Sequence, residues 1–218
     1  MFAGHVGVGL ALGRAERRIN VGVFVAAALL LDFVLWLLIL LGWESVSIPA
    51  SFASTHQPDF DFPYSHGLLA AALWSALAGA LAMLCYSRLP DARWRVAGLV
   101  AAAVFSHWLL DALVHRPELR LAGSTSPAIG LGLWDRMPTA LALEAAIVGV
   151  GMVMFLPGSG LARGRSAALA VLCVVILAFT VLGMTVAPPP PSVAAMAVSS
   201  LIALAVVATL AVYLGRLD

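Results

Sequence analysis

The 218-residue chain contains no lysine and little charge of either sign. Charged residues make up 11% of the sequence, whereas an average soluble domain has about 25%. The net charge is +1 and no basic tail is present, so nucleic acid is not an expected partner. The only two cysteines, Cys85 and Cys173, lie within apolar runs and lack a paired spacing. We therefore interpret them as small core residues and expect no disulfide.

Hydrophobic residues, by contrast, make up 62% of the chain and gather in long runs. A helix needs about 20 apolar residues to cross the hydrocarbon core of a bilayer. Six runs have this length: about 20–42, 66–86, 96–115, 139–157, 167–187 and 193–214. Only helices satisfy their backbone in lipid without closing a barrel, so we predict an all-α, polytopic integral membrane bundle. We expect six full transmembrane helices in one domain, with the site in 1–157 and two scaffold helices in 158–218.

The first 13 residues form a shorter apolar segment that contains His5. As a helix this segment would be about 20 Å long, which is short of a full span. Small residues spaced four apart, such as Gly9 and Gly13 or Gly7 and Ala11, would let it pack closely against another helix. If the segment runs inward from the outer leaflet, His5 lies at the depth of the other polar groups. A segment that spans fully would put His5 elsewhere.

The distribution of arginine predicts the orientation, because loops rich in arginine face the cytoplasm. Nine arginines fall at one end of the predicted spans: Arg14, Arg17, Arg18, Arg88, Arg93, Arg95, Arg163, Arg165 and Arg216. Three fall at the other end: Arg116, Arg120 and Arg136. Abundant alanine without lysine indicates a GC-rich bacterial genome. We therefore expect a multi-pass protein of the bacterial inner membrane with a cytoplasmic C-terminus.

Three ionisable residues, His107, Asp111 and His115, follow one another at intervals of four near the end of the apolar run 96–115. On a helix this spacing places them on one stripe, a turn apart. The two histidines would be about 12 Å apart along the axis, too far to share one metal ion. Asp111 lies between them and can reach both, as a bridging carboxylate in a two-metal site would.

Other ionisable residues lie at a similar predicted depth: Asp32 in the span 20–42, His66 at the start of the next span, and Glu144 in the span 139–157. Polar groups within a membrane are costly and face the bundle interior. Each could be satisfied singly by backbone or hydroxyl groups. Their shared depth in the outer half favours one metal site built from His5, Asp32, His66, His107, Asp111 and His115, with Glu144 nearby. Imidazole with carboxylate suits Zn²⁺, with Mn²⁺ or Fe²⁺ as alternatives, and one or two ions.

The three outer arginines, Arg116, Arg120 and Arg136, follow the histidine stripe. They could bind a substrate phosphate through bidentate hydrogen bonds, or simply keep the loop soluble. Ser65 and Ser106 each precede a histidine and could orient the imidazoles, although helix packing explains them equally well.

These motifs resemble those of the YdjM-like bacterial membrane proteins, a family described as metal-dependent hydrolases of the inner membrane. The resemblance covers about residues 1–150 and rests on His5, Asp32, Pro63-Tyr64-Ser65-His66, Ser106-His107-x-x-x-Asp111-x-x-x-His115-Arg116-Pro117, Gly132-Leu133-Trp134 and Glu144. That family is in turn distantly similar to zinc-dependent phospholipase C and the fungal single-strand nucleases, which are all-helical zinc enzymes acting on phosphoesters.

The resemblance implies a set of ligands for each of two zinc ions. One ion would be held by Asp32, His66, His107 and Asp111. The second would be held by His5, Asp111 and His115, with Glu144 beside them. The second His-x-x-x-Glu/Asp pair and the N-terminal tryptophan of the soluble enzymes are absent here.

Three functions are compatible with this pattern. The first is a membrane-embedded metal-dependent hydrolase acting on a phosphoester of a lipid or lipid-linked molecule at the outer leaflet. In this hydrolase Asp111 would bridge the metals, and Asp32 or Glu144 would act as general base. The second is a metal-ion or proton-coupled transporter, which would place ionisable groups across the full membrane depth. The third is a scaffold with a structural metal. The sequence does not predict the oligomeric state.

Overall fold

Helices make up most of the described chain, residues 1–216, in the computed structural model. Five segments are long and apolar enough to cross a membrane. They are α5 (Leu68–Cys85), α6 (Arg93–Val114), α7 (Met137–Phe155) with the preceding 3-10 turn η1 (Leu133–Arg136), α8 (Arg163–Thr185) and α9 (Val193–Leu214). The predicted helical membrane character is therefore confirmed.

The apolar run 20–42 is a bent pair of helices rather than one straight span. It comprises α2 (Val21–Ala28) and α3 (Leu30–Leu40), whose axes differ by 45°. The Ala28 carbonyl, directly before the bend, accepts a hydrogen bond of 2.7 Å from His107 Nδ1. A side chain that bonds a carbonyl of the helical ladder is a recognised cause of kinks. The residue at the bend is Leu29, with Ala28 and Leu30 on either side, so no proline or glycine predicts the bend from the sequence.

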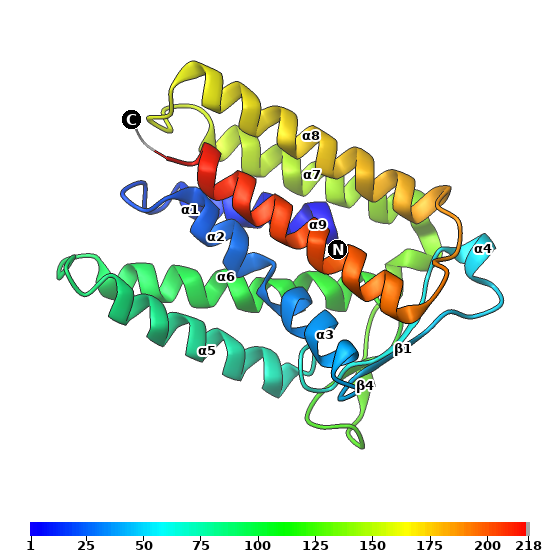
Figure 1. The fold of residues 1–218 in the computed structure, drawn as a ribbon. Helices are drawn as coiled ribbons and strands as arrows, with labels where there is room; N and C mark the ends of the chain where they lie inside the picture. The colour runs from blue at the N-terminus through cyan, green and yellow to red at the C-terminus, as the bar shows by residue number, and fades with distance from the viewer. Residues whose placement is uncertain (217–218) are drawn as a thin grey trace.

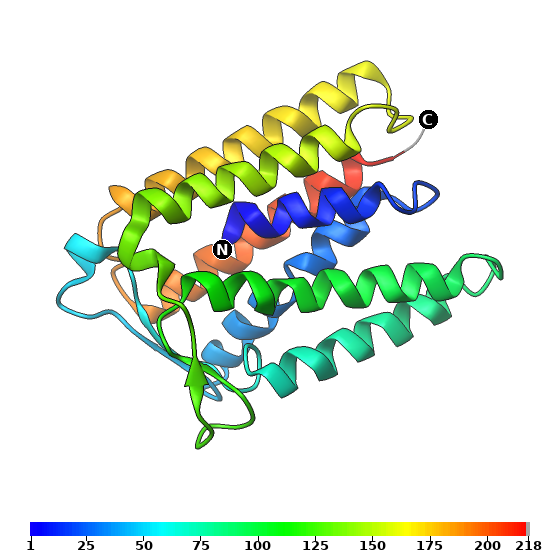
Figure 2. The ribbon, with the colours of Figure 1, turned by 180° about the vertical axis from the view of Figure 1, so that it is seen from behind.

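Helix α1 (Phe2–Gly13) lies inside the bundle, between α7 on one side and α2 and α6 on the other (Figure 2). Its glycines make this position possible. A Cβ atom on Gly7 would lie 2.6 Å from the carbonyl oxygen of Ile147 in α7, and one on Gly9 would lie 2.7 Å from the Cα of Val25 in α2. The close packing that the small-residue spacing predicts is therefore present on two faces of α1.

The remaining helices surround this centre (Figure 1). Helices α5 and α6 pack against each other as a hairpin, and α6 also contacts α2 and α1. Helix α8 packs on α1 and α7, whereas α9 packs mainly on α2 and α3. The two C-terminal helices thus flank α1 from different sides.

Two short hairpins occupy the loops at the end of the bundle that carries the polar stripe. Strand β1 (Ser45–Ser47) pairs antiparallel with β2 (Asp59–Asp61), and the short helix α4 (Phe52–Thr55) lies between them. Strand β3 (Leu119–Arg120) pairs with β4 (Ala128–Ile129). The first hairpin places Phe60 and Phe62 against His115, with ring centroids 5.9 and 5.6 Å apart.

At the opposite end, Glu16 fixes the turn between α1 and α2. Its buried carboxylate accepts hydrogen bonds from the Arg18 side chain at 2.8 and 2.9 Å and lies 3.3 Å from Arg95 in α6. Arg95 also donates to the Ala15 carbonyl. The hydrogen bonds from Arg18 lower the pKa of Glu16, although burial opposes this shift. This ion-pair network ties the arginine-rich end of α1 to α6.

Candidate metal centre

Five of the predicted ligands meet in one cluster, which we call the His/Asp cluster: His5 of α1, Asp32 of α3, His66 directly before α5, and His107 and Asp111 of α6. Two overlapping groups within it have ligand atoms that all lie within 4.8 Å of one another: His5, Asp32 and His107, and His66, His107 and Asp111. Segments far apart in the sequence thus bring imidazoles and carboxylates to one point.

Asp111 lies at the middle of the His/Asp cluster, and its two oxygens face different histidines. Oδ2 is 3.2 Å from His107 Nε2, 3.4 Å from His66 Nε2 and 3.8 Å from His115 Nε2. Oδ1 is 3.2 Å from His5 Nε2. This is the arrangement in which one carboxylate can bridge two cations.

Hydrogen bonds on the far side of the imidazoles determine which nitrogen faces the cluster. His107 Nδ1 lies 2.7 Å from the Ala28 carbonyl, which can only accept, so Nδ1 carries the proton. His115 Nδ1 lies 2.5 Å from a carboxylate oxygen of Glu118 and carries its proton for the same reason. In the neutral form of each ring, Nε2 therefore presents the lone pair, as in metal-binding histidines.

His66 is oriented through a short relay from Glu44. The Ser65 hydroxyl donates to Glu44 Oε2 at 2.7 Å and lies 2.8 Å from His66 Nδ1, so it accepts from that nitrogen. Glu44 also accepts from the backbone amides of Tyr64 and Ser65 at 2.7 and 2.8 Å. Burial raises the pKa of Glu44, while these hydrogen bonds lower it. His66 Nε2 is thereby left with a lone pair as well.

The resulting charge distribution calls for a cation. The Nε2 atoms of His66 and His107 face each other at 3.1 Å, which places two lone pairs together when both rings are neutral, and Asp32 Oδ1 lies 3.7 and 3.6 Å from the same two atoms. His5 is fully buried, and neither of its ring nitrogens has a hydrogen-bond partner among the described residues. Unsatisfied buried nitrogens and facing lone pairs are unfavourable unless a cation lies between them. The donor set therefore fits a divalent metal such as Zn²⁺.

Two predicted residues lie at the edge of the cluster. His115 is the C-cap of α6 and has an extended backbone, so it leaves the helix on which the spacing placed it, although its Nε2 still faces Asp111. Glu144 is buried in α7 and accepts a hydrogen bond of 2.9 Å from the Gly4 amide. The Met1 amine lies 2.6 Å from Asp111 Oδ1, and contributes one positive charge beside three carboxylates.

Two of the three predicted phosphate-binding arginines have different hydrogen-bond partners in the structure. Arg116 donates to Asp135 from Nε and Nη2 at 2.9 and 2.8 Å. Arg120 donates to the Ser126 carbonyl at 3.1 Å, and Arg136 is exposed. Their role in substrate binding stays a prediction. Ser106 bonds the Ala103 carbonyl, so of the two serines only Ser65 orients an imidazole.

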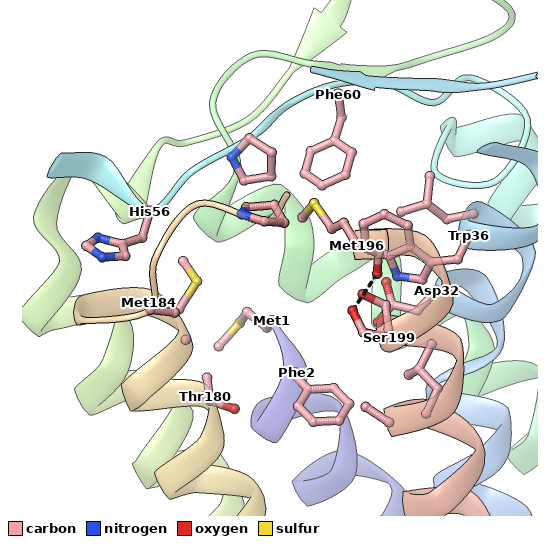
Figure 3. Close-up of a pocket in the computed structure, with 18 of the residues that line it drawn as sticks. Met1, Phe2, Asp32, Trp36, His56, Phe60, Thr180, Met184, Met196 and Ser199 are labelled. Atoms are coloured by element: carbon pink, nitrogen blue, oxygen red, sulfur yellow. Dashed lines mark hydrogen bonds between the residues drawn. The ribbon is translucent and has the colours of Figure 1, made fainter. Parts of the chain in front are cut away.

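A cavity of about 390 Å³ opens beside the His/Asp cluster (Figure 3). Its polar lining comprises Asp32, His66, Asp111, His115 and Glu144, together with His56 and the hydroxyls of Thr180, Ser199 and Ser200. The remaining lining is mostly apolar and comes from α1, α3, α8, α9 and the first hairpin. Asp32 is 22% exposed, whereas Asp111 is 2% exposed, so Asp32 is the more accessible carboxylate.

The sequence analysis missed Glu44 and Glu118 as partners of the cluster histidines. Glu118 follows His115 by three residues, a spacing that could have indicated the contact. Glu44 is 21 residues from Ser65 and carries no such local signal.

Comparison with protein-family models, with curated proteins and with solved structures finds no match to this chain. The geometry described above is therefore the basis for its functional interpretation.

Proposed function

We propose that this protein is a membrane-embedded, metal-dependent hydrolase that acts on a phosphoester of a lipid or lipid-linked molecule. The observation that carries the proposal is the convergence of the His66 and His107 Nε2 atoms on Asp111 at the side of a mostly apolar cavity. Metal ligands beside an apolar cavity match a substrate with a polar reacting group and an apolar remainder.

The residues divide between two ions. His107 belongs to both candidate groups, but its Nδ1 is engaged with Ala28, so only Nε2 remains for one ion. We assign His66, His107 and Asp111 Oδ2 to the first ion. His5, Asp32 and Asp111 Oδ1 form the second set, and His115 supports the outer side. Zn²⁺ is the expected metal, with Mn²⁺ or Fe²⁺ as alternatives.

Divalent ions bound there would supply Lewis acidity, which makes water more nucleophilic near neutral pH and offsets charge on a phosphoryl group. Glu144 is outside both candidate ligand groups and lines the cavity. We therefore assign Glu144 the role of general base, which accepts a proton from water on its carboxylate. The Gly4 amide, which donates to Glu144 Oε2, holds that carboxylate in place.

In the proposed topology the bent pair of α2 and α3 counts as one span, which brings the total to six. Helix α1, with 12 residues, is too short to cross and enters from the outer side. The arginine distribution supports a cytoplasmic C-terminus in a bacterial inner membrane, and in this orientation the cavity would open toward the outer leaflet. A site in the bilayer gives direct access to lipid substrates.

Metal analysis and a hydrolysis assay on the purified protein test the proposal together. We expect one to two equivalents of zinc in the wild type and release of phosphate or a phosphorylated head group from phospholipid in mixed micelles. Asp111→Ala should lose both the metal and the activity, because it removes the shared ligand. Asp59→Ala, in the exposed strand β2, should retain both. The absence of any transition metal after metal-replete purification would contradict the hydrolase assignment.

A further inference from the structure

Helices α8 and α9 carry no acidic, basic or histidine side chain between Val171 and Leu210, yet they form a large part of the cavity wall. Small residues face the cavity from both helices: Thr180, Gly183 and Ala187 from α8 and its C-terminal end, and Ser199, Ser200 and Ala203 from α9. A Cβ atom built on Gly183 would meet no atom within 4 Å. The space between these helices is therefore created by the choice of small side chains.

The larger side chains of this wall are apolar and adaptable. Met184 of α8 and Met196 of α9 lie on opposite sides of the cavity, with Met1 and Phe2 of the first turn of α1 between the two helices (Figure 3). Methionine is unbranched and polarisable, and it adjusts to ligands of different shape. Such a wall suits a flexible hydrocarbon better than a rigid polar ligand.

Two of the three hydroxyl groups in the wall are hydrogen-bonded within their own helices. Thr180 Oγ1 donates to the Ile176 carbonyl at 2.9 Å, and Ser199 Oγ donates to the Met196 carbonyl at 3.0 Å. Both donors are thus satisfied within their own helices. The cavity consequently has one polar side, at the His/Asp cluster, and an apolar side formed by α8 and α9.

We propose that the wall formed by α8 and α9 binds a single hydrocarbon chain of a lipid whose phosphoester head group lies at the His/Asp cluster. The inference rests on the proposed function for the position of the head group. A volume of about 390 Å³ is near the lower end of the roughly 300–1,000 Å³ typical of small-molecule sites, which favours one chain over two. The C-terminal helices then act as the substrate-binding wall rather than as a scaffold.

Photo-crosslinking with a single-chain probe tests this site. The probe is a lysophosphatidate with a diazirine in its acyl chain, added to the full protein in phosphatidylcholine nanodiscs. In the wild type we expect crosslinks on cavity residues such as Met184 and Met196. Gly183→Phe should fill the open space and reduce these crosslinks about tenfold, or about 1.4 kcal/mol. Its metal content should equal that of the wild type, because Gly183 does not contact the ligands.

Gly149→Phe is the matched control, since Gly149 lies in the spanning helix α7, also has open space around its Cβ position, and does not line the cavity. This variant should crosslink as the wild type does. If Gly183→Phe fails to fold, Ser199→Leu fills the same cavity from α9. Crosslinks that lie on exposed residues such as Val175 and Val206, and that neither cavity variant changes, would overturn the chain site.

Measuring the metal content of the same protein after metal-replete purification separates this inference from the proposed function. Crosslinking to α8 and α9 in a protein that binds no transition metal would support the chain site and contradict the hydrolase. A protein that binds metal at Asp111 but shows no crosslinks in the cavity would support the metal centre and contradict the chain site.

Discussion

Glycine serves opposite purposes in the two parts of this bundle. In α1, Gly7 and Gly9 bring the helix into backbone contact with α7 and α2, so that no side chain could be added. In α8, Gly183 borders open space that becomes part of the cavity. The first use packs the N-terminal part tightly, and the second keeps the C-terminal wall open.

The difference agrees with what each part would hold under the two proposals. Metal ligands must be fixed within a fraction of an ångström. The ring nitrogens of His5 have no hydrogen-bond partner among the described residues, so His5 is held by the close packing of α1 and by stacking on the His107 ring, with ring centroids 3.6 Å apart. A hydrocarbon chain needs volume rather than orientation. Substitutions in the tightly packed α1 should therefore change stability and metal content, whereas substitutions in the open wall of α8 and α9 should change the binding of a hydrocarbon chain.

The largest effect is expected for Gly7→Leu. The new Cβ would lie 2.6 Å from the Ile147 carbonyl oxygen and 2.8 Å from the Val148 Cα, both backbone atoms that cannot move aside. Overpacking in a core costs typically about 1–3 kcal/mol, and a backbone clash is at the upper end. We expect a lower melting temperature and loss of metal, measured by intrinsic fluorescence during heating and by elemental analysis.

Gly149→Leu makes the same substitution in α7 where nothing lies within 4 Å, and it should fold normally. A Gly7→Leu protein with wild-type stability and metal content would show that α1 can shift without consequence, and the comparison of the two glycine environments would fail.

A smaller effect is expected for His5→Asn, which should keep the fold intact and remove one proposed metal ligand. His5 lies 3.2 Å from Asp111 Oδ1, the oxygen that faces away from His66 and His107. We expect the zinc content to fall by about one equivalent while the first ion is retained. Inductively coupled plasma mass spectrometry on both proteins measures this difference.

His56→Asn is the control for this variant, because His56 has a left-handed backbone (φ 54°) that asparagine tolerates and belongs to neither ligand group. Equal zinc content in the His5→Asn variant and the wild type would remove His5 from the metal centre.

Much of this arrangement was accessible from the sequence, because ionisable residues in apolar runs are conspicuous. Asp32, His66, His107 and Asp111 had to face the interior, and the helical spacing of the last two placed them together. The position of His5 depended on whether α1 crosses the bundle, which its length alone left open. Its glycines indicated close packing but not the partner helix.

Other features depend on contacts that no local pattern encodes. The bend at Leu29 arises where His107, 79 residues from Ala28, bonds the Ala28 carbonyl. The chain site was missed because α8 and α9 carry no charged residue between Val171 and Leu210, and small residues in a membrane helix predict packing as readily as a cavity. Open space at the Cβ position of Gly183, together with its place in the cavity lining, distinguishes the two.

An intermediate effect is expected for Ser65→Ala, which interrupts the relay from Glu44 to His66. The alanine leaves His66 Nδ1 without the oxygen that now lies 2.8 Å away, so the ring loses its fixed orientation. Removal of such a supporting hydrogen bond typically weakens metal binding about 10–100-fold. Titration with a competing chelator measures the affinity, and Ser54→Ala, in the exposed helix α4, is the control. An unchanged zinc affinity would mean that packing alone orients His66.

The smallest effect is expected for Arg116→Ala, which tests the predicted phosphate contact outside the cavity. Arg116 and Asp135 form an exposed ion pair, and such pairs contribute about 0.2–1 kcal/mol, so the free energy of unfolding should fall by less than about 1 kcal/mol.

Because Arg116 directly follows His115, its charge should still attract the phosphate of lysophosphatidate, although solvent screens the interaction. We expect its dissociation constant to rise a few-fold and this rise to shrink at high salt, as measured by thermophoresis in detergent. Arg88→Ala, at the opposite end of the bundle, should leave the constant unchanged. Identical constants for both variants would exclude Arg116 from substrate binding and leave the His/Asp cluster as the sole site for the phosphate.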